Sequence, residues 1–175
     1  KEQVTLSLGS GFSRKAGAPM ANAIVSALKE SMPDDVKEYY IDETHLDIIS
    51  EEYEQIYSRE HLINKMEDIF NFMPTDTSDH TCLPKIPHIR HIITTNYDTL
   101  IEDAYGPENC YVVRTTADCV NLPQDKTIIY KIHGDFIAKD NIDITKQDYT
   151  NFFSDNNEPL LWKYIQSHIL TNDML

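Results

Sequence analysis

The sequence predicts an α/β fold in which helices cover both faces of a mainly parallel sheet, with a helical insertion at about residues 42–72. Apolar runs typical of buried strands alternate along the chain with segments of helical periodicity, and this order produces parallel sheets. Several runs are continuous and rich in β-branched residues, as expected for strands that are buried on both faces. We expect residues 1–175 to form a single domain.

The first predicted strand is followed by a glycine-rich loop and a helix. The strand is "VTLSLG" at residues 4–9, and the loop "GSGFSRKAGAP" at residues 9–19 holds three of the chain's five glycines. The helix lies in "APMANAIVSALKESM" and ends near Pro33. Its predicted core face consists of Ala23, Ile24, Ala27 and Leu28.

Two amphipathic helices are predicted in the insertion. Asp42 or Thr44 is a suitable cap for the first of them. The apolar positions that recur at helical spacing are Leu46, Ile49, Tyr53 and Ile56, and then Leu62, Met66, Ile69 and Phe70.

Three longer strands are predicted in the second half of the chain. They are Ile89 to Thr94, "CYVVRT" from Cys110 and "TIIYKIHG" from Thr127. The helix "TLIEDAYG" follows the first of them and is closed by Gly106. The segment "NIDITKQDYTNFF" predicts a short strand and a helix capped by Thr145. The final helix, in "EPLLWKYIQSHIL", has a predicted core face of Leu160, Leu161, Tyr164, Ile165 and Ile169.

The composition excludes several classes of partner. A formal charge of −14, with no cluster of lysine or arginine, argues against direct binding of nucleic acid. No apolar run approaches the roughly 20 residues that a transmembrane helix needs, so we expect no membrane association. The first residues, "KEQVTLSLG", are too short and too mixed for a signal peptide. We therefore expect a cytoplasmic location.

The cysteines and histidines do not form a recognisable metal motif. Cys82, Cys110 and Cys119 contain no C-x-x-C pair, so they can build neither a disulfide framework nor a four-cysteine zinc site. One segment, "DHTCLPKIPHIRH", brings two pairs of possible ligands together, but their spacing matches no known site and a loop that merely contains histidines is the simpler interpretation. These residues are His80, Cys82, His88 and His91. We expect no metal, and no zinc in particular.

The glycine-rich loop has the chemistry of a phosphate site. After a buried strand, Gly9 and Gly11 let the backbone approach a phosphate closely, while Ser10 and Ser13 offer hydroxyl donors. The next helix would add its N-terminal amides. The loop matches neither the Walker pattern, nor the common dehydrogenase fingerprint, nor a G-x-S-x-G nucleophile motif. It favours a nucleotide pyrophosphate, with an ordinary strand-to-helix turn as the alternative.

Polar side chains follow two further strands at the same edge of the predicted sheet. Asn96 and Asp98 come after one strand, and His133 ends another, where Gly134 lets the chain turn away sharply. An amide and a carboxylate can bond a carboxamide or ribose hydroxyls, and a neutral histidine can accept a proton from a ribose hydroxyl or from water. This set would suit cleavage of a glycosidic bond to nicotinamide. The alternatives are turn and helix-capping roles for Asn96 and Asp98, and a structural role for His133.

Three ordered motifs resemble those of the sirtuin family. "GSGFSRKAGAP" is similar to the sirtuin loop G-A-G-x-S-x-x-S-G-I-P, "TTNYD" to T-Q-N-I-D, and "KIHGDF" to the segment that contains L-H-G. The three motifs span residues 4 to about 136, and "DITKQDYTNFF" resembles a segment of bacterial sirtuin-like proteins and extends the similarity to about residue 153. The resemblance implies a Rossmann-type domain that binds NAD as its substrate.

The resemblance also implies the roles of individual residues. Asn96 and His133 would be the catalytic pair, and Asp98 would contact the nicotinamide carboxamide. The residues expected to bind the nucleotide are Gly9, Ser10, Gly11, Phe12, Ser13, Gly17, Asn96 and Asp98. Pro19 falls on the last position of the loop motif.

The sequence departs from the protein-deacylating sirtuins. It lacks their four-cysteine zinc module, and Met20, Ala21 and Asn22 replace the D-F-R that follows their loop. It is more similar to the zinc-free sirtuin-like domains of prokaryotic anti-phage defence proteins. The family continues with a strand of the type F-I-G-x-S-L, whereas this sequence stops at Leu175 after a helix, so we expect C-terminal strands to be missing and the nucleotide site to be incomplete.

The resemblance implies hydrolysis of NAD to nicotinamide and ADP-ribose, with NAD depletion in defence as its purpose. We expect a fused or associated sensor or effector domain and a homo-oligomer. The same pocket would also serve a protein deacylase or an ADP-ribosyltransferase. A module that senses a nucleotide without consuming it is a further alternative, as is an interaction domain that binds no nucleotide.

Overall fold

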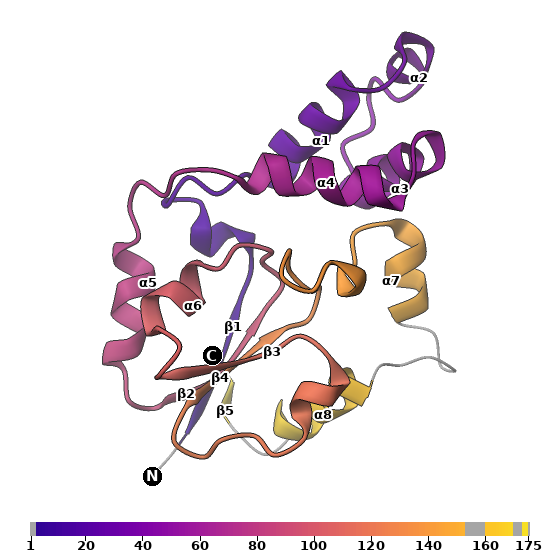
Figure 1. Cartoon of the computed structure of the whole chain (residues 1–175). Coiled ribbons are helices and arrows are strands. Elements are labelled where there is room, and N and C mark those ends of the chain that lie inside the picture. Colours follow the sequence, from indigo (N-terminus) through magenta and orange to yellow (C-terminus); the bar gives the residue numbers. More distant parts are fainter. Residues whose placement is uncertain (1–2, 153–159, 170–172, 175) are drawn as a thin grey trace. The chain divides into compact units, whose positions relative to one another are not determined.

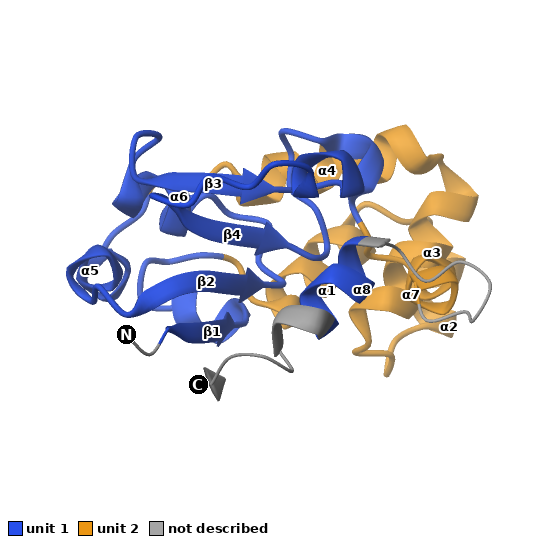
Figure 2. Cartoon of the chain, turned by 90° about the horizontal axis from the view of Figure 1, so that it is seen from below, with its two compact units in different colours: residues 1–18, 74–142, 158–175 blue, residues 19–73, 143–157 orange. Residues whose placement is uncertain are grey.

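The chain folds into two compact units, each assembled from segments that are distant in the sequence (Figure 2). The computed structural model describes residues 3–152, 160–169 and 173–174. The first unit comprises residues 1–18, 74–142 and 158–175, and the second comprises residues 19–73 and 143–157. The expectation of a single domain over residues 1–175 stays a prediction.

The first unit is built around a parallel sheet with the strand order β3-β4-β2-β1-β5. All four strand pairings are parallel, with Leu6 opposite Ile92 and Ile92 opposite Ile129. The strands are β1 (Val4–Leu8), β2 (Ile89–Thr94), β3 (Cys110–Val113), β4 (Thr127–Lys131) and β5 (Asp173–Met174). This arrangement confirms the predicted Rossmann-like α/β class.

Helices cover both faces of this sheet because neighbouring residues of a buried strand point to opposite sides (Figure 1). Ile92 belongs to a core shared with Ile101 of α6, whereas its neighbour Ile93 belongs to a core shared with Leu161 and Ile165 of α8. The helical elements on the first side are α5 (Ser78–Cys82), the 3₁₀ turn η2 (Leu83–Lys85) and α6 (Leu100–Tyr105), and those on the second are the 3₁₀ turn η3 (Thr116–Cys119) and α8 (Leu160–Ile169).

The second unit is helical. Its elements are α1 (Ala21–Glu30), α2 (Asp34–Tyr39), α3 (Leu46–Ile56), α4 (Arg59–Phe70) and α7 (Lys146–Phe152). Helices α3 and α4 confirm the two amphipathic helices predicted in the insertion, and Ile49, Leu62 and Met66 are fully buried. Arg59 forms ion pairs of 2.9 Å with both Glu54 and Asp148, which link the insertion to α7 within this unit.

Two predicted details of these helices are wrong. In the described part of the chain neither Asp42 nor Thr44 caps α3; the helix begins at Leu46, and Glu43 accepts the amide hydrogens of Thr44 and His45 instead. In α1 Val25 is buried and Ala23 is exposed, so the core face is rotated from the predicted one. The larger side chain of Val25 gains more from burial than a methyl group does.

The short strand predicted before α7 is also absent from the described residues. Residues 139–141 form a 3₁₀ turn, and the next three residues are irregular. The predicted cap of α7 is confirmed, because the Thr145 hydroxyl accepts the amide hydrogen of Asp148 at 3.1 Å, while the Asp148 carboxylate accepts the amide hydrogen of Thr145 at 2.9 Å. This reciprocal capping box competes successfully with the weak strand tendency of a three-residue run.

The C-terminal residues add a strand that the sequence did not predict. Asp173 and Met174 pair in parallel with Val4 and Thr5 of β1, so a short strand follows the last helix. Of the predicted core face of α8, Leu161 and Ile165 are buried, whereas the side chains of Leu160 and Ile169 lie outside the described residues. Within the described ranges, every helix is too short or too polar to cross a lipid bilayer.

Candidate functional site

Three polar loops follow adjacent strands at the carboxyl edge of the sheet. The glycine-rich loop follows β1, Asn96 and Asp98 follow β2, and His133 follows β4. Because β1, β2 and β4 are neighbouring parallel strands, these loops emerge at one edge. Two hydrogen bonds extend the ladder past the strand ends: the Thr95 amide donates to the Leu8 carbonyl at 3.3 Å, and the Ile132 amide donates to the Thr94 carbonyl at 3.1 Å.

The glycine-rich loop forms a 3₁₀ turn, η1 (Ser10–Ser13), directly after β1. Gly9, Ser10 and Gly11 are exposed, and Phe12 is half-buried. An added Cβ on Gly9 would make only an ordinary contact of 3.8 Å with Thr95, and among the described residues one on Gly11 would meet no atom within 4 Å. Gly17 differs because its φ of +91° lies in the left-handed region that favours glycine.

Ser13, His80 and Asn96 form a buried cluster beside this loop, called here the polar cluster. The Asn96 side-chain amide donates from Nδ2 to the Ser13 hydroxyl at 3.1 Å, and His80 Nε2 lies 3.1 Å from the same oxygen. The exposed fractions of Ser13, His80 and Asn96 are 0%, 1% and 4%. Within the described part of the chain, Asn96 Oδ1 and His80 Nδ1 are buried without a hydrogen-bond partner.

Asp98 has a structural role of the kind that the alternative interpretation expected. Its Oδ1 accepts the amide hydrogen of Leu100 at 3.1 Å, at the first turn of α6. Its backbone carbonyl accepts a hydrogen bond from Lys131 Nζ at 2.5 Å. The loop that carries Asn96 is thus held at both α6 and β4.

His133 occupies the turn after β4. The Gly134 amide donates to the Lys131 carbonyl at 3.0 Å, which reverses the chain sharply, and Gly134 has a φ of +71°. A Cβ at Gly134 would collide with the carbonyl oxygen of Asn141, so only glycine fits. The predicted sharp turn is confirmed. Burial lowers the pKa of His133 to about 4, so its imidazole is neutral at pH 7.

Four charged side chains form a second buried group, called here the charged cluster. Arg114 Nε donates to both carboxylate oxygens of Asp135, at 2.7 and 2.8 Å, and Lys131 Nζ lies 3.1 Å from Glu102 Oε1 and 4.0 Å from Asp135 Oδ2. The side chains of Lys131 and Asp135 are fully buried. Burial also raises the pKa of Glu102, although nearby Lys131 opposes this effect.

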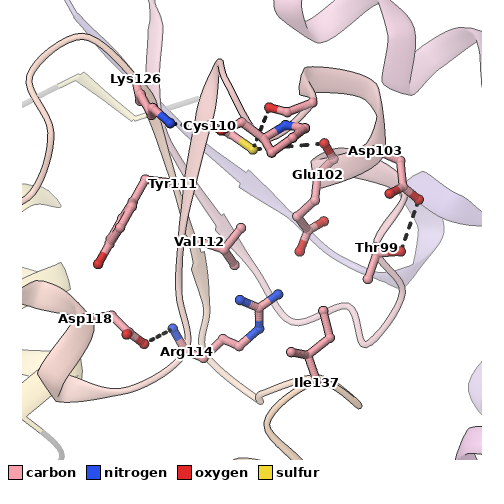
Figure 3. Close-up of a pocket in the computed structure, with 12 residues that line it drawn as sticks. Thr99, Glu102, Asp103, Cys110, Tyr111, Val112, Arg114, Asp118, Lys126 and Ile137 are labelled. Atoms are coloured by element: carbon pink, nitrogen blue, oxygen red, sulfur yellow. Dashed lines mark hydrogen bonds between the residues drawn. The ribbon is translucent and has the colours of Figure 1, made fainter.

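A cavity of about 650 Å³ lies beside the edge strand β3 (Figure 3). Glu102 and Arg114 point into it from α6 and from the end of β3. The residues that line it are Thr99, Glu102, Asp103, Gly106, Pro107, Cys110, Tyr111, Val112, Arg114, Asp118, Lys126 and Ile137, and they differ from the predicted site residues. Arg114 and Glu102 are paired with Asp135 and Lys131, although neither Glu102 oxygen has a hydrogen-bond partner among the described residues. The strand ends, which carry the predicted site residues and the open Asn96 Oδ1, are the better candidate site.

Two histidines of residues 80–91 contact other side chains of the protein. His80 contacts Ser13, and His91 lies 3.3 Å from the Tyr130 hydroxyl and stacks on its ring. Cys82 and His88 are exposed. In the part of the chain that the structure describes, no group of three or more histidine, cysteine, aspartate or glutamate side chains is arranged to hold a metal ion.

Sequence reasoning missed two parts of this region. The sequence offers a metal ligand or a plain loop residue as the interpretations of His80, whereas the structure brings it to Ser13, 67 residues away along the chain. The charged cluster was missed entirely. Its one visible signal was Lys131, a charge inside the apolar run "TIIYKIHG", which indicates a buried ion pair.

Comparisons with known proteins agree with the sequence motifs. Residues 90–175 match the family model described as SIR2-like domain. The chain is 32% identical to "Defense-associated sirtuin 2" of Bacillus subtilis over 90 residues, which is 49% of its own length. This match covers 9% of that protein. The chain is 30% identical to "NAD(+) hydrolase ThsA" of Acinetobacter baumannii (strain 532279) over 119 residues, which is 66% of its own length. This match covers 22% of that protein.

The matched part therefore spans less than a quarter of the length of either relative. The match to the family model includes the loop after β2 and the turn after β4, which carry Asn96 and His133. Family match, relatives and fold together confirm the resemblance seen in the sequence: the chain carries a sirtuin-like domain of the type found in defence proteins.

Proposed function

We propose that the chain hydrolyses NAD to nicotinamide and ADP-ribose, and that it does so to deplete NAD in anti-phage defence. The observation that carries the proposal is the buried Asn96 amide, whose Oδ1 has no partner in the described structure and lies at the same sheet edge as the glycine-rich loop and His133. A buried acceptor without a partner is rare in a protein interior, and a substrate hydroxyl or a water would satisfy it. The name of one relative, an NAD(+) hydrolase, supports the substrate, and the name of the other supports the defence role.

The glycine-rich loop would hold the pyrophosphate. The protein itself does not require glycine at positions 9 and 11, because neither lies in the left-handed region and neither is closely packed. A ligand that approaches the backbone gives a physical reason for both. The exposed Ser10 hydroxyl and backbone N–H groups of the loop would then donate to phosphate oxygens, as at other anion sites built from backbone N–H groups.

The proposed reaction breaks the bond between the ribose C1′ and the nicotinamide nitrogen. The bonding electron pair leaves with nicotinamide, which becomes neutral, while Asp98 holds its carboxamide. Water adds to the oxocarbenium-like ribose, with its oxygen held by Asn96 Oδ1 and its proton accepted first by His133 and then by solvent. Because His133 is neutral at pH 7, it can act as an acceptor in this step.

Nicotinamide release from NAD tests this proposal directly. We expect His133→Ala and Asn96→Ala to abolish release while the melting temperature stays close to that of the wild type. His91→Leu is the matched control, because it removes a histidine that contacts Tyr130 elsewhere in the first unit. Wild-type release by both site variants would contradict the assignment. Release only with an acylated or acceptor protein would indicate a deacylase or transferase, and tight binding without turnover would indicate a nucleotide sensor.

The wider biological setting is part of the same proposal. Both relatives are much longer than their match to this chain, which supports an attached or associated sensor or effector domain. A homo-oligomer and a cytoplasmic location stay proposals as well. Light scattering of the protein with and without NAD would measure the oligomeric state, and assays should include the full-length protein or its partner.

A further inference from the structure

His80 is the least explained member of the polar cluster. It comes from α5, outside the motifs shared with sirtuins, and only 1% of its surface is exposed. Burying an imidazole costs free energy unless its polar atoms are used. The ring packs edge-on against Phe12, with centroids 4.7 Å apart, and an apolar side chain would pack there equally well. The nitrogen that faces Ser13 is therefore the feature that packing leaves unexplained.

The ring reaches Ser13 through one of its two nitrogens. Nε2 lies 3.1 Å from the Ser13 hydroxyl, whereas Nδ1 is buried and has no partner in the described structure. The hydrogen of the neutral ring can lie on either nitrogen: on Nε2 it is donated to the Ser13 oxygen, and on Nδ1 it leaves Nε2 free to accept the hydrogen of the Ser13 hydroxyl. Burial lowers the pKa of His80 and keeps the ring neutral, although Asp98 and Asp79 oppose this shift. In either tautomer a hydrogen bond joins His80 Nε2 to the Ser13 hydroxyl.

The Ser13 hydroxyl consequently links two side chains. It accepts a hydrogen bond from Asn96 Nδ2 and is hydrogen-bonded to His80 Nε2. With its hydroxyl held by α5, Ser13 can fix the amide of Asn96 in place. Asn96 Oδ1 remains the open acceptor at the edge of the sheet.

We propose that His80 is a positioning residue, which acts through the Ser13 hydroxyl to hold the Asn96 amide in the orientation that the reaction uses. This inference rests on the proposed function, because it assigns Asn96 its catalytic role. It adds a residue from a separate helix, α5, to the residues that position the site. His80 itself does not contact the substrate.

Steady-state kinetics of NAD hydrolysis by the full chain test the proposal. His80→Leu keeps the bulk of the ring but loses the hydrogen bond to Ser13, and His80→Gln returns an amide that can donate or accept near the position of Nε2. We expect His80→Leu to lower kcat by about 10- to 100-fold with little change in KM, because a small misplacement of a catalytic group has effects of this size. His80→Gln should recover most of the loss, and His91→Leu should match the wild type.

A double-variant cycle tests whether His80 acts through Ser13. If it does, adding His80→Leu to Ser13→Ala should lower kcat by less than about twofold beyond Ser13→Ala alone. If the two substitutions instead lower kcat by independent factors that multiply in the double variant, His80 does not act through Ser13. A wild-type kcat in His80→Leu, or an equal loss in His80→Leu and His80→Gln, would overturn the positioning role.

A readout without turnover separates this proposal from the proposed function. In ¹⁵N-labelled protein, the side-chain NH₂ signals of Asn96 should shift in His80→Leu and return toward their wild-type positions in His80→Gln. Unchanged Asn96 signals in His80→Leu would overturn the inference even if NAD is hydrolysed. If the wild type releases no nicotinamide, the proposed function fails, and the NMR signals still decide whether His80 positions Asn96.

Discussion

The polar cluster and the charged cluster lie in the same unit, but their buried polar groups are stabilised by different interactions. Ser13, His80 and Asn96 are joined by hydrogen bonds between neutral groups and leave two buried atoms without partners in the described structure. In the charged cluster, each of the four charges lies within 4.0 Å of an opposite charge. An unpaired buried charge costs far more than an unpaired neutral acceptor. In the described structure Glu102 of the charged cluster also lacks a hydrogen-bond partner for either oxygen, so the two clusters differ in charge: the Glu102 carboxylate lies 3.1 Å from Lys131, whereas the polar cluster needs no ion pair.

The largest effect on stability is expected from Lys131→Met, which would break the charged cluster. It leaves the buried carboxylates of Glu102 and Asp135 without this cation and should lower the free energy of unfolding by about 3–5 kcal/mol. Asn96→Ala, the matched change in the polar cluster, should cost about 1 kcal/mol while removing activity. Urea denaturation of both variants measures the difference.

The double variant Lys131→Met with Glu102→Gln serves as the control for this comparison. Neutralising the carboxylate that lost its partner should restore part of the lost stability. Equal losses in Lys131→Met and Asn96→Ala would show that the two clusters contribute alike to folding, and the contrast drawn above would fail.

A second test concerns the glycines next to the polar cluster. Gly11→Ala should leave the free energy of unfolding within about 0.5 kcal/mol of the wild type, because in the described structure the added Cβ meets no atom within 4 Å. It should nevertheless weaken NAD binding at least about tenfold if the backbone approaches phosphate there. Gly17→Ala should instead cost about 1 kcal/mol, since its φ is +91°. Calorimetric titration measures NAD binding, and urea denaturation measures the free energy of unfolding. A Gly11→Ala variant with normal NAD affinity would count against the phosphate role of the loop.

The pH dependence of stability should have opposite signs for the buried histidines His80 and His133 and for Glu102 of the charged cluster. For His80 and His133, burial lowers the pKa below the ordinary value of 6.5, to about 4 for His133, so the unfolded protein binds more protons in this range. The stability that the two neutral histidines contribute is fully present above pH 6.5 and is lost as the pH falls toward 4. Burial raises the pKa of Glu102 above its ordinary 4.5, so its contribution is largest in acid and falls as the pH rises.

Urea denaturation midpoints measured between pH 4 and 8 test these signs when each variant is compared with the wild type. His80→Leu should be less sensitive than the wild type to falling pH. Glu102→Gln should gain stability relative to the wild type as the pH rises. Parallel pH profiles for all three proteins would mean that neither buried group changes its protonation on folding.

The smallest effect is expected where charges are paired without burial. Lys15 lies 3.2 Å from Asp76 and 3.5 Å from Asp79, but about half of each of these side chains is exposed. Water and salt screen such pairs, so Lys15→Met should leave the denaturation midpoint almost unchanged at physiological ionic strength. A loss as large as that of Lys131→Met would show that charge alone, rather than burial, makes the charged cluster important.

The strands and the strand-end motifs could be predicted because their signals are local. The apolar runs that became β1, β2, β3 and β4 are continuous in the sequence, and Gly134 and Thr145 have the turn and capping roles expected of them. Strand β5 was missed because its two described residues are too few to show periodicity.

The contacts that complete the candidate site depend on distant segments and could not be predicted. His80 meets Ser13 only after α5 has packed beside the sheet, and no spacing in the sequence indicates this. The caps of the helices were less predictable than their existence, because Asp, Glu, Ser and Thr compete for the same amides; Glu43 took the role expected of Thr44. The catalytic roles of Asn96 and His133 stay predictions until activity is measured.

The segmented build of the first unit sets the order in which the protein can fold during synthesis. Strand β1 leaves the ribosome before the other strands of its sheet, yet its register partners begin at Ile89 and Asp173. Helices α1, α3 and α4 are complete before β2 exists, so they can pack while β1 is still unpaired. Pairing of such distant segments is slow and exposes apolar strand surface. The nascent chain should therefore depend on chaperones until β2 has been made.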